Sequence, residues 1–237
     1  MKEVKQLYSD ENFSLMTVSG KDTDMCFVSF TGFNQVHGSN HNDFIGSIAR
    51  SGCGLFVHDH KKSWGTFIDD NLLTEKVYEF AAGRRIFLIG TSMGATSALY
   101  FSKVINCDAV ISFGAQFSLD HDIVKTDNWL DPQVFERSKE LSAIAKFKDI
   151  NFIKENKKTM YYIFHGAKDL FDIVHSAHFP TSGENINRYT IEESRHVVSD
   201  YFKQNDLLGD LFSYLPNRET ENFEISMRKK GVKFIKR

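Results

Sequence analysis

One stretch, residues 85–101, constrains the possible folds of this chain more than any other. An apolar run, Ile86–Ile89, leads directly into Gly90-Thr91-Ser92-Met93-Gly94, and a segment rich in small residues follows. This order predicts a buried strand, a tight turn and a helix. Gly90 and Gly94 flank Ser92 where strand and helix pass too close for a Cβ atom. The turn therefore holds Ser92 in a strained conformation with its hydroxyl exposed.

The G-x-S-x-G stretch, with a strand before it and a helix after it, resembles the nucleophile elbow of the α/β-hydrolases. The resemblance covers about residues 25–210 and implies an α/β fold, with a mostly parallel central sheet and helices on both faces. It also implies that an acid and a histidine follow the serine, each after a later strand.

Two later strand exits meet that requirement. The strand at residues 159–164 ends in His165-Gly166-Ala167-Lys168-Asp169, and the strand at residues 188–191 is followed by His196. The resemblance therefore implies a triad of Ser92, Asp169 and His196. Asp172, three residues after Asp169, remains the alternative acid.

Other strand exits supply candidates for the rest of the site. By resemblance, the loop after residues 25–30 supplies an oxyanion-hole donor at Phe33, and Met93 supplies the second. Trp64 lies in the loop after residues 54–57 and lines the substrate pocket or packs in the core. Gln116 and Phe117 follow the strand at residues 107–114 and are expected at the same edge, as substrate-binding residues.

The 237 residues and 41% hydrophobic content fit one domain, residues 1–215, with a basic C-terminal extension at residues 216–237. Residues 115–158 interrupt the strand–helix alternation, and we expect them to form a small cap insertion. The apolar runs at residues 13–18 and 25–30 flank a Gly/Asp turn, which suggests a hairpin. Trp129, Leu130, Phe135 and Leu141 could face the substrate or pack on the sheet.

Composition excludes several partner and cofactor classes. A net charge of −2 gives no global field for nucleic acid. No segment is long enough for stable membrane insertion, and no N-terminal signal pattern is visible, so we expect a cytoplasmic protein. The three cysteines suit a reducing compartment. His58 and His60 could form a metal pair, but no third ligand is evident, and the chemistry needs no metal or cofactor.

The resemblance implies a serine esterase that cleaves a carboxylic ester of a small molecule or glycan through an acyl-Ser92 intermediate. Gly-Thr-Ser-Met-Gly-Ala and Gly-Ala-Gln-Phe-Ser are also similar to hydrolase-fold proteins of bacterial surface-polysaccharide pathways. An O-acyltransferase acting on a glycan is therefore the first alternative. A non-catalytic binding protein on the same fold is the second. The oligomeric state is not indicated.

Overall fold

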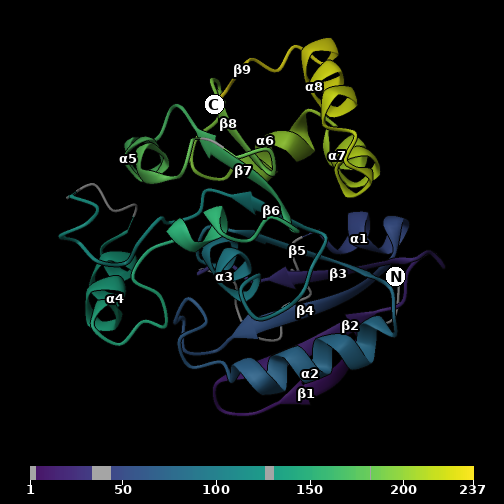
Figure 1. Cartoon of the computed structure of the whole chain (residues 1–237), viewed down its shortest axis with the longest axis vertical. Coiled ribbons are helices and arrows are strands. Elements are labelled where there is room, and N and C mark those ends of the chain that lie inside the picture. The colour runs from purple at the N-terminus through teal and green to yellow at the C-terminus, as the bar shows by residue number, and fades with distance from the viewer. Residues whose placement is uncertain (1–3, 34–43, 126–130, 182) are drawn as a thin grey trace.

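A single mixed sheet runs through the computed structural model, which describes residues 4–33, 44–125, 131–181 and 183–237. Its strand order is β1-β2-β4-β3-β5-β6-β7-β8-β9 (Figure 1). The six strands from β4 to β8 in this order are parallel, while β1, β2 and β9 pair antiparallel at the two edges. The strands are β1 (Val4–Ser9), β2 (Phe13–Val18), β3 (Met25–Phe30), β4 (Cys53–Asp59), β5 (Arg85–Thr91), β6 (Ala109–Phe113), β7 (Met160–Gly166), β8 (Ile186–Ile191) and β9 (Phe234–Lys236).

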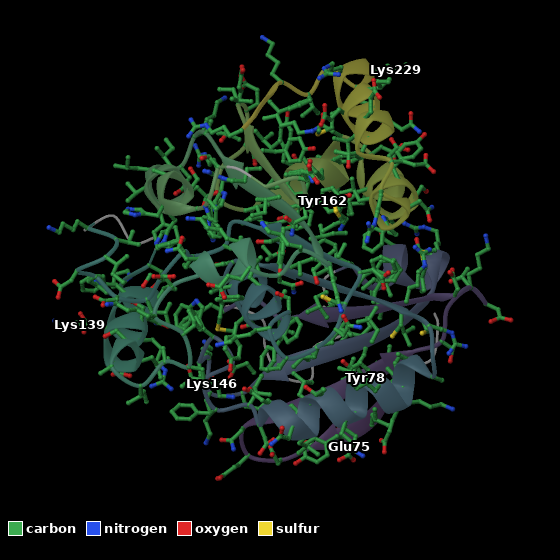
Figure 2. All side chains as sticks on the ribbon, viewed as in Figure 1. Glu75, Tyr78, Lys139, Lys146, Tyr162 and Lys229 are labelled. Atoms are coloured by element: carbon green, nitrogen blue, oxygen red, sulfur yellow. The ribbon has the colours of Figure 1, made fainter. Side chains whose placement is uncertain are left out.

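Helices cover both faces of this sheet. The described helices are α1 (Ile45–Ser51), α2 (Asp70–Ala81), α3 (Met93–Phe101), α4 (Pro132–Ser142), α5 (Leu170–His178), α6 (Val198–Gln204), α7 (Leu208–Tyr214) and α8 (Thr220–Lys229), with short 3-10 turns η1 (Asn151–Lys154) and η2 (Leu215–Asn217). One apolar core lies under α2, α3, α4 and α5, and a second lies under α1, α6, α7 and α8. Figure 2 places Tyr162 inside the fold, while Glu75, Lys139 and Lys229 lie at its outside. The predicted α/β architecture is confirmed.

The central strands are apolar on both sides because helices cover both sides. All residues of β6 are buried, and β3 and β5 are buried except at their first residues. The predicted hairpin between residues 13–18 and 25–30 is wrong. β2 pairs with β1 and β4, whereas β3 lies between β4 and β5. Five of the six residues of β3 are buried, as expected for a strand in the middle of the sheet, and β4 lies between β3 and β2.

The C-terminal residues, expected as an extension after residue 215, continue the same fold. Phe223 and Met227 of α8 are buried in the second core, and β9 pairs with β8. Figure 1 shows α8 and β9 beside β8. Most of the basic side chains of this segment remain at the surface.

The predicted cap insertion at residues 115–158 is described except for residues 126–130, so Trp129 and Leu130 lie outside the described residues. Its helix α4 contacts the loop after β4, where Arg137 donates a hydrogen bond to the Lys61 carbonyl at 2.9 Å. Leu141 is buried in the first core, and Phe135 packs against that core. These two side chains therefore follow the packing alternative.

Candidate active site

Ser92 lies in the turn between β5 and α3, as the sequence predicts. Its backbone has φ 54° and ψ −121°, a region that non-glycine residues enter only when the surrounding structure enforces it. A Cβ atom on Gly90 would lie 2.3 Å from the Gly94 backbone, and one on Gly94 would lie 2.1 Å from the Phe30 carbonyl oxygen. The glycines allow this close approach of strand and helix, and Ser92 projects its hydroxyl at the carboxyl edge of the sheet.

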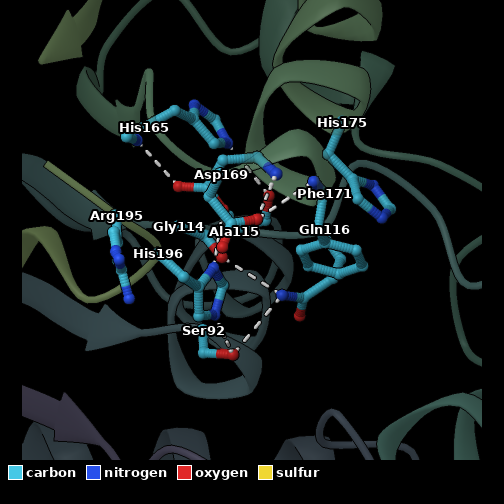
Figure 3. Close-up of polar contacts among 12 residues, drawn as sticks. Ser92, Gly114, Ala115, Gln116, His165, Asp169, Phe171, His175, Arg195 and His196 are labelled. Atoms are coloured by element: carbon cyan, nitrogen blue, oxygen red, sulfur yellow. Dashed lines mark hydrogen bonds and ion pairs between the residues drawn. The ribbon is translucent and has the colours of Figure 1, made fainter. Parts of the chain in front are cut away.

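His196 follows β8 and reaches Ser92 across the sheet edge. Its Nε2 atom lies 2.8 Å from Ser92 Oγ. Figure 3 shows the two side chains facing each other. Gly114, with φ 63°, stands beside the imidazole, and a Cβ atom there would lie 3.0 Å from His196 Cε1. A Cβ atom on Gly166 would lie 2.2 Å from the Arg195 carbonyl oxygen. Both glycines therefore leave the space that the histidine loop occupies.

The carboxylate that contacts His196 belongs to Asp172, so the sequence prediction of Asp169 in this position is wrong. Asp172 Oδ1 lies 2.6 Å from His196 Nδ1, and Asp172 Oδ2 accepts a hydrogen bond from the Gly166 N–H at 2.7 Å. Asp172 is 1% exposed. Two directed hydrogen bonds in a buried place hold this carboxylate against the imidazole.

Asp169 performs a different task at the start of α5. It is the N-cap residue, and its carboxylate accepts hydrogen bonds from the Phe171 and Asp172 N–H groups at 3.0 and 3.3 Å. An aspartate directly before a helix satisfies the unpaired N–H groups of the first turn. The cap signal is present in the sequence, because Asp169 precedes a mainly apolar segment, and it could have pointed to Asp172 as the acid.

Two more buried histidines, His165 and His175, support the backbone of the loop after β6. His165 Nε2 lies 3.0 Å from the Ala115 carbonyl oxygen, and burial lowers the pKa of His165. His175 Nδ1 accepts a hydrogen bond from the Phe117 N–H at 3.1 Å, and burial lowers the pKa of His175 well below its ordinary value. Both rings are therefore neutral near pH 7, and they fix the loop after β6 on which Gln116 lies.

The two predicted oxyanion donors lie in segments that touch. Met93 is the first residue of α3, where the N–H groups of a helix have no partner within the helix. Phe33 is 7% exposed and ends the described part of the loop after β3. The glycine before it, Gly32, is close to the elbow, because its Cβ would lie 3.4 Å from the Thr91 carbonyl oxygen. The loop after β3 therefore passes directly over the turn that carries Ser92.

The three predicted substrate-binding residues have different surroundings. Gln116 Nε2 lies 3.5 Å from Ser92 Oγ, and Trp64 Nε1 donates a hydrogen bond to Gln116 Oε1 at 2.7 Å. Phe117 instead points into the first core, where its ring packs against Phe179 at a centroid distance of 5.4 Å. The structure thus brings Gln116 to the serine and Trp64 to Gln116, whereas the Phe117 ring belongs to the packing of α5.

Among the described residues, no third ligand accompanies His58 and His60, the two histidines considered as a metal pair. His60 Nε2 lies 2.9 Å from Ser14 Oγ. Within residues 4–33, 44–125, 131–181 and 183–237, no group of three or more His, Cys, Asp or Glu side chains is arranged to hold a metal ion. In the same ranges, no helix has the length and apolar character needed to cross a bilayer.

Comparison with known proteins identifies the fold. No protein-family model matches the sequence, and no curated protein matches it. Among solved structures, the esterase Pf2001 of Pyrococcus furiosus aligns with a TM-score of 0.63 and 16% identity, over 91% of each chain. The esterase domain of a Rhodothermus marinus protein aligns with a TM-score of 0.60 and 15% identity, over 91% of this chain and 98% of that one.

A third similar structure has a different description. The Gap123 glycosylation-associated protein complex of Streptococcus agalactiae aligns with a TM-score of 0.58 and 15% identity, over 86% of this chain and 45% of that one. At these identities, the likeness concerns the fold.

Proposed function

We propose that this chain, which has the α/β-hydrolase fold, is a serine hydrolase that cleaves a carboxylic ester. The observation that carries the proposal is the chain of hydrogen bonds from Asp172 through His196 to Ser92, at 2.6 and 2.8 Å. The strained backbone of Ser92 supports it, because such strain persists where function requires an exposed nucleophile. The esterase descriptions of two structural neighbours agree with this proposal.

In this proposal, Ser92, His196 and Asp172 each have one role. His196 Nε2 removes the Ser92 hydroxyl proton as Oγ attacks the ester carbonyl carbon. Asp172 keeps the remaining imidazole proton on Nδ1 and stabilises the positive charge of the ring. The N–H groups of Met93 and Phe33 stabilise the oxyanion, and each such donor contributes about 3–4 kcal/mol where measured. His196 then protonates the leaving alcohol, and the C–O bond to that alcohol breaks.

Deacylation repeats these steps with a second nucleophile. Water gives up a proton to His196 and attacks the acyl-Ser92 carbonyl, which releases the acid and restores the hydroxyl. No step needs a metal or an organic cofactor. The substrate is an ester of a small molecule or of a glycan, and the retained triad geometry favours catalysis over a binding role alone.

Transfer of the acyl group to a glycan hydroxyl is the second candidate function. The observation that favours it is the likeness to a structure described as a glycosylation-associated protein complex. A transferase gains by keeping water away from acyl-Ser92 until its acceptor binds. The described part of the insertion packs on α2 and on the loop after β4. From this side it can restrict the access of water to Ser92.

Steady-state turnover of p-nitrophenyl acetate separates the two functions. We expect hydrolysis to continue after the first turnover without any added sugar, and to be lost in Ser92→Ala. The same reaction is repeated with candidate glycans. A burst followed by almost no turnover, with rescue by a glycan that then carries the acetyl group, would establish the transferase in place of the esterase.

A further inference from the structure

Gln116 brings an amide group to the oxygen atom of Ser92. It lies in the loop after β6 and is 1% exposed. Its Nε2 atom is 3.5 Å from Ser92 Oγ and 3.1 Å from the Gly114 carbonyl oxygen (Figure 3). An amide nitrogen carries two hydrogens, so one can be donated to each of these oxygen atoms.

The orientation of this amide is fixed by its other end. Trp64 Nε1 donates a hydrogen bond to Gln116 Oε1 at 2.7 Å, and Thr96 Oγ1 lies 3.0 Å from the same oxygen. An indole nitrogen can only donate a hydrogen bond, so the atom that faces it must be the amide oxygen. The Gln116 N–H also donates to Thr96 Oγ1 at 2.8 Å. The nitrogen end of the side chain is therefore the end that faces Ser92.

A strained loop holds the indole in place. Trp64 has φ 52° and is 1% exposed, a left-handed conformation that is unusual for a bulky residue. The Asp59 carboxylate at the end of β4 accepts hydrogen bonds from the Ser63 and Gly65 N–H groups, at 2.8 and 3.0 Å. These bonds on both sides of Trp64 keep the loop in the conformation that places its indole against Gln116.

We propose that Gln116 is a catalytic residue that donates an N–H to Ser92 Oγ, and that Trp64 is a positioning residue that acts through Gln116. This assignment rests on the proposed serine hydrolase function. The Ser92 hydroxyl gives its hydrogen to His196 Nε2, and the lone pairs of Oγ accept from Gln116. The serine is thereby held in the rotamer that points its proton at the base.

The same N–H stabilises the partial negative charge that Oγ carries while its proton moves to His196, whereas the charge of the tetrahedral intermediate lies on the former carbonyl oxygen. The Ser92 O–H bond breaks, the proton goes to His196 Nε2, and the Oγ electron pair forms the bond to the ester carbonyl carbon while the C=O π pair moves onto the carbonyl oxygen. Gln116 neither gains nor loses a proton in this step. The distance of 3.5 Å belongs to the free enzyme, and such contacts tighten as charge develops.

Four variants test the assignment: Gln116→Met, Gln116→Glu, Trp64→Phe and the control Gln133→Glu, which places the same new charge on the exposed surface of α4. The readouts are kcat and KM for p-nitrophenyl acetate, the rate of Ser92 labelling by a fluorophosphonate, the pH profile and the melting temperature. For Gln116→Met, which keeps the length of the side chain, we expect kcat to fall about 10-fold to 100-fold with KM changed less than about 3-fold.

The charged variant distinguishes a donor from a packing residue. In Gln116→Glu, Trp64 still holds one oxygen, so the second carboxylate oxygen faces Ser92 and attracts its proton away from His196. We expect a larger loss of kcat than in Gln116→Met. We also expect the acid limb of kcat/KM to move to higher pH, because a negative charge favours protonated His196. Trp64→Phe keeps an aromatic ring and removes the N–H that holds Gln116 Oε1. The Gln116 amide then loses its fixed orientation, and kcat should fall about 10-fold.

If the wild type hydrolyses the ester, either of two results overturns the assignment of Gln116. One is a Gln116→Met variant whose kcat and labelling rate stay within about 2-fold of wild type. The other is an equal loss in both Gln116 variants with an unchanged pH profile and a lowered melting temperature, which indicates packing alone. A wild type that neither hydrolyses the ester nor is labelled at Ser92 instead refutes the serine hydrolase proposal itself.

Discussion

Exchange of Asp172 for asparagine tests the acid of the proposed triad with almost no change in side-chain volume. In the structure, one carboxylate oxygen faces the His196 Nδ1 atom and the other accepts from the Gly166 N–H. An asparagine has a single acceptor oxygen for these two places. If that oxygen pairs with Gly166, the amide NH₂ faces His196 Nδ1 and forces the proton onto Nε2. An imidazole with its proton on Nε2 cannot take the Ser92 proton.

The expected size of this effect follows from the same geometry. An asparagine in place of the triad aspartate reduces kcat about 10⁴-fold in serine proteases, through the wrong histidine tautomer. That factor corresponds to about 5.4 kcal/mol of transition-state stabilisation. Asp172 is 1% exposed and hydrogen-bonded to the imidazole, so solvent cannot replace it. We therefore expect kcat of Asp172→Asn to be lower than that of the wild type by about 10³-fold or more.

Asp169→Asn is the matched control, since the two aspartates lie three residues apart on the same helix start. Asparagine caps a helix about as well as aspartate, so the hydrogen bonds to Phe171 and Asp172 survive. We expect kcat within about 2-fold of wild type and at most about 1 kcal/mol loss of stability from the missing charge. The assay is p-nitrophenyl acetate turnover with urea unfolding of both variants. A large loss in Asp169→Asn with an active Asp172→Asn refutes the reasoning.

Three further outcomes are expected. Gly114→Ala should lower kcat with a smaller effect on the melting temperature, because at φ 63° the new Cβ atom would lie 3.0 Å from His196 Cε1 and displace the imidazole. A variant with the kcat of the wild type argues against this contact. Iodoacetamide should alkylate Cys53 before Cys26 and Cys107, because Cys53 is partly exposed, the other two thiols are buried, and the neighbouring Cys26 lowers the pKa of Cys53. Mass spectrometry identifies the site, and first reaction at Cys26 or Cys107 contradicts this order. Burial lowers the pKa of His175, so below about pH 6.5 the unfolded chain binds a proton that the folded protein does not, and the free energy of unfolding should fall by up to about 1.4 kcal/mol per pH unit. Urea unfolding at several pH values should show a smaller dependence of this free energy on pH in His175→Gln. An unchanged dependence contradicts the prediction.

The sequence predicts most of this site because its signals are local. The apolar strand, Ser92 between its two glycines, and the helix that follows occupy consecutive residues. The two glycines allow the close backbone contacts at this turn. His196 is identified through the resemblance, which requires a histidine after a later strand, and parallel strands bring their carboxyl ends to one edge. The fold class follows from the resemblance that the Ser92 stretch carries, and the sheet order agrees with it.

The sequence predictions are wrong where two residues or two segments are equally suited to one position in the fold. Asp169 and Asp172 both follow β7, and the helix cap takes the first, which leaves the second for His196. The runs at residues 13–18 and 25–30 are both apolar, but only burial on two faces decides that β3 is central and β2 is not. The contact of Trp64 with Gln116 joins residues 52 positions apart, and no local pattern reports it.

Identification of the residue that a fluorophosphonate labels tests the central claim most directly. Trypsin releases Ser92 in a peptide, Ile86–Lys103, that also contains Ser97 and Ser102, so fragmentation must locate the adduct within it. Both other serines are buried, and their hydroxyls bond to carbonyl oxygens of their own helix. We predict a single adduct on Ser92 that is absent from Ser92→Ala and strongly slowed in Asp172→Asn. An adduct on Ser97 or Ser102, or no adduct on the folded protein, would contradict the account.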